Sequence, residues 1–537
     1  MTSALVQRVV RLLLAALVLH LLLVHPNHPA ALTWQAPFLF ALELPVILLG
    51  LVAAWGGIAT ALRIGVTFAL TVLTVLKTAD FAMFTALARG FNPVADLVLL
   101  DAGLRLLSGA IGTLAATATA VAAVLAIVVI AAATWWATGV WAALSPRRST
   151  SLATGVASVI AASVAIAEIS QALGRWTPPL TPPGAAFTAR LGVERIIMVR
   201  DTLEDLRNFR AAASQDPYAE AQGLFDRIDR DVLVVFVESY GRTSLDTPYY
   251  AATHRKTLQN NEEHLREKGL SLASGLLRAP TQGGQSWLSH ATFANGLWVS
   301  DQTRYGAVLA SGRETLYHLA ARSGFHTAAV MPQITLDWPE SAVMGFDTVL
   351  AAGDLKYRGP PFNWVTMPDQ FTLSALDRLL RNTPRDNPLF VQIALGSSHA
   401  PWVPVPHLVN WGDIGDGQIF TPMALAGDTP EEVWRDRDRV RLQYRKAIDY
   451  ALSTVFDYAA RHADDPPLMI VLGDHQAADF VAVDDRPDVP IHVIGPPEAM
   501  APVAEWGWAD GLIPARDTPP WRMDVFRDRF IAAYTTG

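Results

Sequence analysis

A long, apolar and charge-poor first third constrains this chain more than any other feature. Residues 1–176 carry only 14 of the 92 Lys, Arg, Asp and Glu side chains of the 537-residue chain. About 20 apolar residues are enough to span a bilayer core. Five stretches are candidate spans: they lie near Leu12–Val24, Pro37–Trp55, Ile64–Leu76, Ile111–Ala133 and Leu152–Leu173. The sequence therefore predicts a transmembrane domain of five helices over residues 1–174.

The basic residues around these stretches predict how the chain is oriented. Arg8 and Arg11 precede the first stretch, and Arg147-Arg148 lie between the fourth and the fifth. Basic loops are kept on the cytoplasmic side of a membrane. We therefore expect a multi-pass protein of the cell (inner) membrane, with the chain beyond residue 174 extracytoplasmic or periplasmic. The first stretch could also be a signal peptide, but no small-residue cleavage site follows it, so we expect a retained helix.

Three acidic side chains lie in or beside the apolar stretches: Glu43, Asp80 and Glu168. An intramembrane acid can mark a proton or ion path. The alternative, which we favour, is an acid that faces the helix bundle near the interface. No repeat relates the five stretches, which gives a transporter little support.

The rest of the chain is charged and acidic, with a formal net charge of −12 against +4 for residues 1–176. Nucleic-acid phosphates require a basic face, so we expect no nucleic-acid partner. The chain has no cysteine, which excludes a disulfide framework, thiolate metal ligands and a cysteine nucleophile.

A cluster of prolines after the last apolar stretch marks a break in the chain, and we assign residues 175–229 to a juxtamembrane linker. Beyond it, apolar β-branched runs alternate with helical stretches, as in buried parallel strands joined by helices. The runs begin at Asp231 and recur at Thr327–Met331, Leu389–Leu395, Leu468–Leu472 and Val489–Ile494. This alternation predicts an α/β domain over residues 230–537, with a mainly parallel sheet sandwiched by helices.

Polar side chains follow three of these runs at the points where the strands should end. Glu238 follows the first, His399 the third, and Asp474-His475 the fourth. Parallel sheets place their sites at the carboxyl ends of strands, where carboxylates and an imidazole suit a divalent ion such as Zn²⁺ or Mn²⁺. Each residue could instead be an ordinary cap or loop residue. We expect the domain's other noted histidines to be surface or packing residues: His254, His264, His290, His318, His326 and His492.

A glycine-rich turn between the first two runs precedes a helix that begins at Ser286. A serine at a helix N-terminus lies where an anion would settle, and a nearby metal would lower the pKa of its hydroxyl. The plain alternative is that Ser286 only caps the helix.

The order of these motifs resembles the alkaline phosphatase superfamily. The motifs are Glu238-Ser239, a glycine-rich turn with a hydroxyl, a later His399-Ala400-Pro401, and Asp474-His475. The resemblance is nearest to the sulfatase-like branch with lipoteichoic acid synthase and the phosphoglycerol transferases of periplasmic glucans, and more distant to phosphoethanolamine transferases. It covers most of the chain, because that synthase also has five spans, a short linker and an extracytoplasmic catalytic domain. It implies an alkaline phosphatase/sulfatase-like fold.

The resemblance also implies roles for individual residues. Glu238, Asp474 and His475 match metal ligands, and Ser286 stands where the family has a nucleophilic threonine that is also a ligand. The implied cofactor is one divalent metal ion, Mn, Zn or Mg. His399 matches a histidine that contacts the substrate and can protonate a leaving group.

The remaining implied substrate contacts depart from the family pattern. Trp338 stands at the family's Trp-x-Arg unit, but Glu340 replaces the arginine and would repel a phosphate. Met331 stands at a histidine position, and Gln476 replaces the glycine that usually follows the Asp-His pair. We assign Trp338 and Gln476 to substrate binding, together with His399, and expect a head group that differs from that of the synthase.

The sequence thus predicts a membrane-anchored transferase that moves a phosphoglycerol- or phosphoethanolamine-type head group through a covalent Ser286 intermediate. Its partners would be the bilayer, a membrane phospholipid donor and an envelope glycan or lipid acceptor. Two alternatives remain: a phosphodiester or phosphomonoester hydrolase at the same site, and a non-catalytic membrane sensor with a degenerate site. Sulfate-ester hydrolysis is not expected, because the residues after Ser286 lack the pattern needed for conversion to formylglycine.

Overall fold

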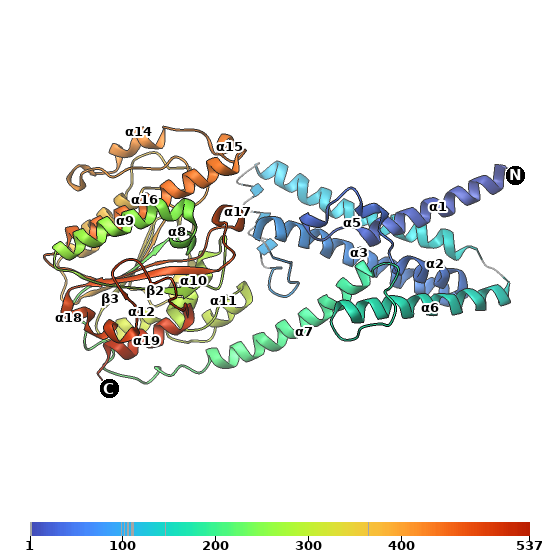
Figure 1. Ribbon diagram of the computed structural model, residues 1–537, viewed down its shortest axis with the longest axis horizontal. Coiled ribbons are helices and arrows are strands. Elements are labelled where there is room, and N and C mark those ends of the chain that lie inside the picture. The colour runs from blue at the N-terminus through green and yellow to red at the C-terminus, as the bar shows by residue number, and fades with distance from the viewer. Residues whose placement is uncertain are drawn as a thin grey trace. The chain divides into compact units, whose positions relative to one another are not determined.

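The computed structural model describes residues 3–87, 89–97, 99–100, 103–104, 107–108, 112–144, 147–363 and 365–536. The chain divides into two compact units, Met1–Asp205 and Leu206–Gly537; most of their helices are labelled in Figure 1. The boundary between them falls inside the segment 175–229 that the sequence assigns to a linker.

The first unit is a set of apolar helices. The helices are α1 (Ser3–Val24), α2 (Glu43–Ala53), α3 (Gly56–Leu87), α5 (Thr113–Ala142), α6 (Arg148–Ala172) and α7 (Phe187–Ala213), which continues into the second unit. Four of the helices described here, α1, α3, α5 and α6, are long and apolar enough to cross a membrane. Ile111, where the sequence places the start of the fourth span, lies outside the described residues.

The expected five-helix count is not confirmed, because the second predicted span is a short helix. With 11 residues at 1.5 Å each, α2 covers about half of a bilayer core of about 30 Å. Two prolines explain the difference. Pro37 lies in a 3-10 turn, Ala36–Phe38, and Pro45 lies in the first turn of α2. Proline lacks an N–H and clashes with the preceding turn, so a helix cannot run from Pro37 through Pro45.

The three acids of this unit face its interior and bind the start of α7. Each accepts hydrogen bonds from residues 187–195: Glu43 from the amides of Thr188 and Ala189 at 2.7 and 2.9 Å, Glu168 from Arg190 at 3.1 Å, and Asp80 from Arg195. All three acids are buried. They therefore fix the first turns of α7 to the helices around it. Their partners are residues of α7, which agrees with acids that face the helix bundle and not with a proton or ion path.

The second unit is built on one mixed sheet. Its strands are β1 (Val232–Val237), β2 (Ser271–Arg278), β3 (His326–Met331), β4 (Thr348–Ala351), β5 (Leu389–Leu395), β6 (Leu468–Gly473), β7 (Asp488–Gly495), β8 (Ala509–Asp510) and β9 (Trp521–Arg522). Their order is β4-β3-β5-β1-β6-β7-β2-β8, and β9 pairs with β2. The five strands from β4 to β6 are parallel, whereas β7 is antiparallel to β6 and β2 is antiparallel to β7.

The sheet is therefore not purely parallel. It differs from the predicted arrangement in the direction of β7, which is antiparallel to β6. The sequence suggests β7 as a further parallel strand. The connection from β6 to β7 contains only the four-residue helix α17 (Asp479–Ala482). A parallel return requires a crossover, usually a helix, over the face of the sheet. Without such a helix, the connection turns back at the edge where β6 ends.

Helices cover both faces of the sheet. They are α8 (Thr243–Asp246), α9 (Pro248–Glu267), α10 (Ser286–Asn295), α11 (Gln302–Leu309), α12 (Leu316–Arg322), α13 (Asp369–Leu376), α14 (Thr421–Ala424), α15 (Pro430–Val433), α16 (Arg437–Arg461), α18 (Pro497–Met500) and α19 (Phe526–Tyr534), with a π-turn at Asp377–Arg381. Alternate residues of β1 enter two different apolar cores, one with α9, α13 and α16, the other with α12, α18 and α19. The result is a three-layer α/β/α domain.

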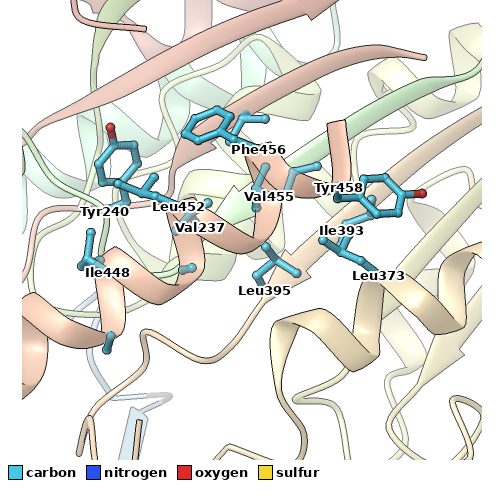
Figure 2. Packing of buried hydrophobic residues seen from close by; sticks show 14 of the residues in the cluster. Val237, Tyr240, Leu373, Ile393, Leu395, Ile448, Leu452, Val455, Phe456 and Tyr458 are labelled. Carbon is cyan, nitrogen blue, oxygen red and sulfur yellow. The ribbon is translucent and has the colours of Figure 1, made fainter. Parts of the chain in front are cut away.

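Helix α16 shows how the first of these cores is built. Ile448, Leu452 and Val455 recur at helical spacing and are fully buried. In Figure 2 they lie over the sheet residues Val237 and Leu395. Full burial of side chains of this kind contributes roughly 1.5–3 kcal/mol each. This packing fixes the ends of β1 and β5, which carry the residues of the candidate site.

Candidate active site

Three neighbouring parallel strands bring the predicted polar residues to one edge of the sheet. β1 lies between β5 and β6, and Val237 pairs with Leu395 on one side and with Gly473 on the other. The residues that follow these partners include Glu238 after β1 and Asp474 after β6. The strand register alone therefore places the two carboxylates side by side.

Glu238, Asp474 and His475 form a compact buried cluster. One ligand atom from each lies within 4.8 Å of the other two. The Nε2 atom of His475 is 3.1 Å from Oε1 of Glu238 and 3.9 Å from Oδ1 of Asp474. Within the described residues, these three form the one group of His, Cys, Asp and Glu side chains with this geometry.

The hydrogen bonds of His475 leave one ring nitrogen available to a ligand. Its Nδ1 lies 3.0 Å from the backbone oxygen of Gln476, which makes Nδ1 a donor, so Nε2 carries the lone pair when the ring is neutral. Nε2 is buried and forms no hydrogen bond, although it lies beside the carboxylate of Glu238. An imidazole nitrogen and two carboxylates are suitable ligands for Zn²⁺ or Mn²⁺, so the residues present fit a divalent cation.

The three side chains of the cluster have strongly shifted pKa values when only protons balance their charge. Burial would raise the pKa of Glu238, but His475 and, more weakly, His399 hold it well below its usual range. Burial and the charge of Glu238 raise the pKa of Asp474. Burial lowers the pKa of His475, but the two carboxylates outweigh it and raise this pKa to about 9. Bound protons therefore take the place that a cation would fill.

Ser286 lies against this cluster. It is the first residue of α10, and its Oγ donates a hydrogen bond to Oε2 of Glu238 at 3.0 Å. The preceding Gln285 adopts a left-handed conformation with φ of 66°. The amide of Gly283 donates to the backbone oxygen of Gln476 at 2.8 Å, which ties the glycine-rich turn to the segment that carries two of the three ligands.

Ser239 supports both carboxylates, a role that sequence reasoning missed. Its amide donates to Oδ1 of Asp474 at 2.8 Å, and its hydroxyl to Oε1 of Glu238 at 3.2 Å. Ser239 has φ of 58°, and Tyr444 donates a hydrogen bond to its backbone oxygen at 2.9 Å. Left-handed non-glycine residues are strained and concentrate at functional sites. The available signal was the position of Ser239 directly after Glu238 at a strand end.

His399 is carried by the loop after β5 and lies near Glu238, whose pKa it helps to lower. The side chain is half-buried, and its Nδ1 is 2.5 Å from the backbone oxygen of Ala400, which leaves Nε2 for another partner. The neighbouring Ser398 donates from Oγ to the backbone oxygen of Glu238 at 2.7 Å. The loop is therefore bonded to the strand end that provides the first metal-type ligand.

Asp369 holds the start of this loop, and sequence reasoning missed that role as well. Its Oδ1 accepts the amides of Gly396 and Ser397 at 2.9 and 2.8 Å, and its own amide donates to the Ser397 hydroxyl at 2.9 Å. The adjacent Gln370 binds the backbone of Val409 in both directions, at 2.7 and 3.0 Å. The segment Pro368-Asp369-Gln370-Phe371 thus fixes both ends of the loop that carries His399.

Two residues that the sequence assigns to substrate binding lie differently from the rest. The Gln476 side chain is fully buried over Gly241, and a Cβ added to that glycine would lie 1.6 Å from Oε1 of Gln476. Trp338 packs near Phe346, with ring centroids 6.3 Å apart. The structure therefore brings together Glu238, Asp474, His475, Ser286 and His399, whereas the side chains of Trp338 and Gln476 make none of the contacts described for that group.

His290 is a buried neighbour of the cluster. It follows Ser286 by one helical turn, and its ring lies 4.1 Å from that of Phe236 between centroids. Burial lowers its pKa to about 4, against the opposing effect of the Glu238 carboxylate. The sequence predicts a surface or packing residue at this position, and His290 is a packing residue. Its spacing of one helical turn from Ser286 was the signal that it would lie near the site.

Comparison with known proteins relates the second unit to one protein family. Residues 230–479 match the family model described as Sulfatase. This part of the chain is therefore similar to sulfatases, the branch that the sequence resemblance names. The chain combines this domain with an N-terminal unit that contains four membrane-spanning candidates. None of the curated proteins matches the chain in sequence.

The solved structures similar to this chain include a lipoteichoic acid synthase, a phosphoglycerol transferase and a lipooligosaccharide phosphoethanolamine transferase. Lipoteichoic acid synthase LtaP from Listeria monocytogenes has 12% identity and a TM-score of 0.34, covering 53% of this chain and 71% of that one. Phosphoglycerol transferase GacH from Streptococcus pyogenes has 13% identity and a TM-score of 0.31, covering 54% of this chain and 73% of that one. The soluble domain of lipooligosaccharide phosphoethanolamine transferase A from Neisseria meningitidis has 12% identity and a TM-score of 0.36, covering 60% of this chain and 90% of that one.

Proposed function

We propose that this protein is a membrane-anchored, metal-dependent transferase that moves a phospho-head group from a membrane phospholipid to an envelope glycan or lipid. The observation that carries the proposal is the Ser286 hydroxyl, bonded at 3.0 Å to Glu238 within the cluster that Asp474 and His475 complete. A hydroxyl in this position at a helix N-terminus is arranged to act as a nucleophile on an anionic phosphorus centre.

Glu238, Asp474 and His475 would hold one divalent cation, Mn, Zn or Mg, with Ser286 as an additional ligand. Such an ion lowers the pKa of a neighbouring hydroxyl and neutralises charge on phosphoryl oxygens. The side chains themselves orient the nucleophile, because Glu238 accepts the Ser286 hydrogen bond and Ser239 fixes both carboxylates.

The proposed reaction has two displacements at phosphorus. In the first, Oγ of Ser286 forms a bond to the phosphorus of the lipid head group, and the bond from phosphorus to the diacylglycerol oxygen breaks. His399 gives a proton to that leaving oxygen. In the second, an acceptor hydroxyl attacks the phospho-serine and gives its proton to His399, and Oγ of Ser286 leaves as the alkoxide that begins the next cycle. The head group has then moved to the acceptor, and both the nucleophile and the acid are restored.

The basic residues support an extracytoplasmic position for the catalytic unit. Arg8 and Arg11 lie near the start of α1, and Arg147-Arg148 lie at the start of α6, so the positive-inside rule places both helix starts on the cytoplasmic side. The end of α6 then lies outside the cytoplasm, which requires that the segment containing the short α2 crosses the membrane together with α1, α3 and α5. A catalytic unit on that side would meet envelope glycans and the outer leaflet of the inner membrane.

A hydrolase with water as the second acceptor uses the same residues. The two functions separate when purified protein is incubated with head-group-labelled phospholipid and an envelope glycan fraction. The transferase predicts diacylglycerol and labelled glycan in equal amounts, whereas a hydrolase gives diacylglycerol and free head-group phosphate. Ser286→Ala is the matched control, because it removes the nucleophile and leaves the three other ligands in place.

A non-catalytic sensor is the third candidate, supported by Glu340 and Gln476 at positions where the family resemblance implies Arg and Gly. Metal analysis separates it from the enzymes. Purified transferase or hydrolase should retain close to one equivalent of a divalent metal, and Asp474→Asn should lose it. A protein that contains no metal and releases no diacylglycerol would contradict the proposed function.

A further inference from the structure

The membrane unit contains a cavity that nothing in the proposed reaction uses. It has a volume of about 340 Å³ and lies where the ends of α1 and α6 meet the start of α7. Its polar lining includes His25, Asn27, Lys77, Arg190 and Glu194. The remainder of the lining is apolar and includes Leu39, Phe187 and Leu191. A cavity with one charged part and one apolar part suits a molecule that has both.

Lys77 is the unusual member of this lining. Its side chain is 2% exposed, and its Nζ donates to the backbone oxygen of Leu23 and to the hydroxyl of Thr188, each at 2.8 Å. Both partners are neutral, and no carboxylate of the described residues lies within ion-pair distance of Nζ. The nearby Glu43 directs one oxygen to the amides of Thr188 and Ala189 instead.

A buried ammonium is costly to desolvate, and an ionisable residue inside a membrane unit usually marks a binding site or pathway. The charge of Glu43 acts on Lys77 from beyond ion-pair distance. Arg190 brings a second positive charge to the same cavity, and it pairs with Glu168 at 3.1 Å and with Glu194 at 3.9 Å. Among the described residues of the lining, Lys77 is therefore the cation without a direct carboxylate contact. Basic pockets between membrane helices are suited to lipid head groups, whose phosphate provides an anion for such a contact.

The position of the cavity indicates which lipids can reach it. The bond from Lys77 to Leu23 places this side chain level with the end of α1, and the cavity also includes Ala172, the last residue of α6. This is the end of the helices from which the chain continues into the second unit. A head group bound here would belong to the leaflet on the side that the proposed function assigns to catalysis.

We propose that this cavity binds the phosphate-bearing head group of a membrane phospholipid, with Lys77 as its main anion contact. The phosphate lies at Lys77, and the glycerol portion and the first acyl carbons lie against Leu39, Phe187 and Leu191. The inference rests on the proposed function only where it makes the bound lipid the head-group donor. Binding itself needs neither the metal cluster nor Ser286.

The test measures lipid binding by the delipidated full-length protein in detergent, by native mass spectrometry. The probes are phosphatidylglycerol, diacylglycerol and inorganic phosphate. Lys77→Met should weaken phosphatidylglycerol binding by about tenfold or more, since it removes a charged hydrogen bond to phosphate. Lys77→Arg should retain most of it. Arg63→Met is the matched control, because Arg63 lies on the same helix, where it contacts Trp135, and does not line the cavity.

Ala172→Trp keeps the test decisive if Lys77→Met does not fold. It fills the exposed mouth of the cavity without removing any bond of Lys77, and it should weaken phosphatidylglycerol binding as strongly. The inference is overturned if diacylglycerol or inorganic phosphate binds as tightly as phosphatidylglycerol, or if Ala172→Trp binds like the unchanged protein. Ser286→Ala should bind normally without turnover, so failure of the proposed function and failure of this inference give different results.

Discussion

The hydroxyl of Ser286 donates a hydrogen bond of 3.0 Å to the carboxylate of Glu238, 48 positions away in the chain. Glu238 directly follows a strand of the sheet, and Ser286 begins a helix after a tight glycine-rich turn. The contact joins the candidate nucleophile to the candidate metal ligands. Because both residues stand on rigid elements, the geometry needs no ligand to assemble it.

Metal binding should depend strongly on pH. The carboxylates raise the pKa of His475 to about 9, and a protonated imidazole cannot be a ligand. Below that pH, a cation must displace the proton, so the apparent affinity should rise about tenfold per pH unit as pH increases towards 9. Calorimetric titration with Zn²⁺ or Mn²⁺ in buffers of different ionisation enthalpy measures both the affinity and the released proton. Equal affinity at pH 6 and pH 8 would contradict this prediction.

Loss of His399 should matter most for substrates with poor leaving groups. A general acid contributes about 10²–10⁴-fold when the leaving oxygen is an alkoxide. His399→Ala should therefore lower kcat by that order for a phospholipid, and by less than about tenfold for a nitrophenyl phosphodiester, whose leaving group needs no proton. Kinetics with the two substrates provides the comparison. An equal loss for both would show that His399 acts in another way.

Asp369 should make stability fall as the pH rises. Burial raises its pKa from an ordinary 3.8 to about 6, so the folded protein favours the protonated acid. The stabilising contribution is complete below about pH 3.8 and is lost as the pH passes 6; it corresponds to about 3 kcal/mol. Asp369→Asn keeps an acceptor for Gly396 and Ser397 but cannot ionise. The melting temperature of the variant relative to the unchanged protein in detergent should therefore increase between pH 5 and pH 8, whereas parallel curves would refute the assignment.

The ion pair of Asp80 and Arg195 should be necessary to hold α7 on the membrane unit. Both side chains are buried, so Arg195→Met alone leaves an uncompensated charge and should cost about 3–5 kcal/mol. Asp80→Asn combined with Arg195→Met removes both charges and should recover most of that loss. Melting temperatures of the full-length variants in detergent complete the cycle. A double variant as unstable as the single one would mean that the pairing is not the cause.

Much of the candidate site could be predicted from the sequence, because its residues follow apolar strands that are easy to recognise. Parallel strands end at one edge, so Glu238, Asp474 and His475 were expected to meet, and the pairing of Val237 with Gly473 explains why they do. The glycine-rich turn and the helix start pointed to Ser286, and the family resemblance implied its role as nucleophile; the structure places its hydroxyl on Glu238. These inferences needed only strand direction and the first residue of a helix.

The parts that could not be predicted depend on tertiary contacts or on local backbone rules. Asp369 acts through backbone amides 27 and 28 positions away, which no local pattern encodes. The apolar run around α2 has the composition of a membrane span, which led to the prediction of a full-length helix. Its prolines shorten that helix to 11 residues. The direction of β7 depends on the path of the preceding connection, and a buried antiparallel strand has the same composition as a parallel one.

The measurement that tests the central claim most directly is the mass of the peptide that contains Ser286 after rapid quenching of the enzyme with phospholipid. The account predicts that this peptide gains the mass of a head-group phosphate, and that Ser286→Ala gains none and loses turnover by about 10³-fold or more. Steady turnover by Ser286→Ala, or a modified residue elsewhere in the chain, would contradict it.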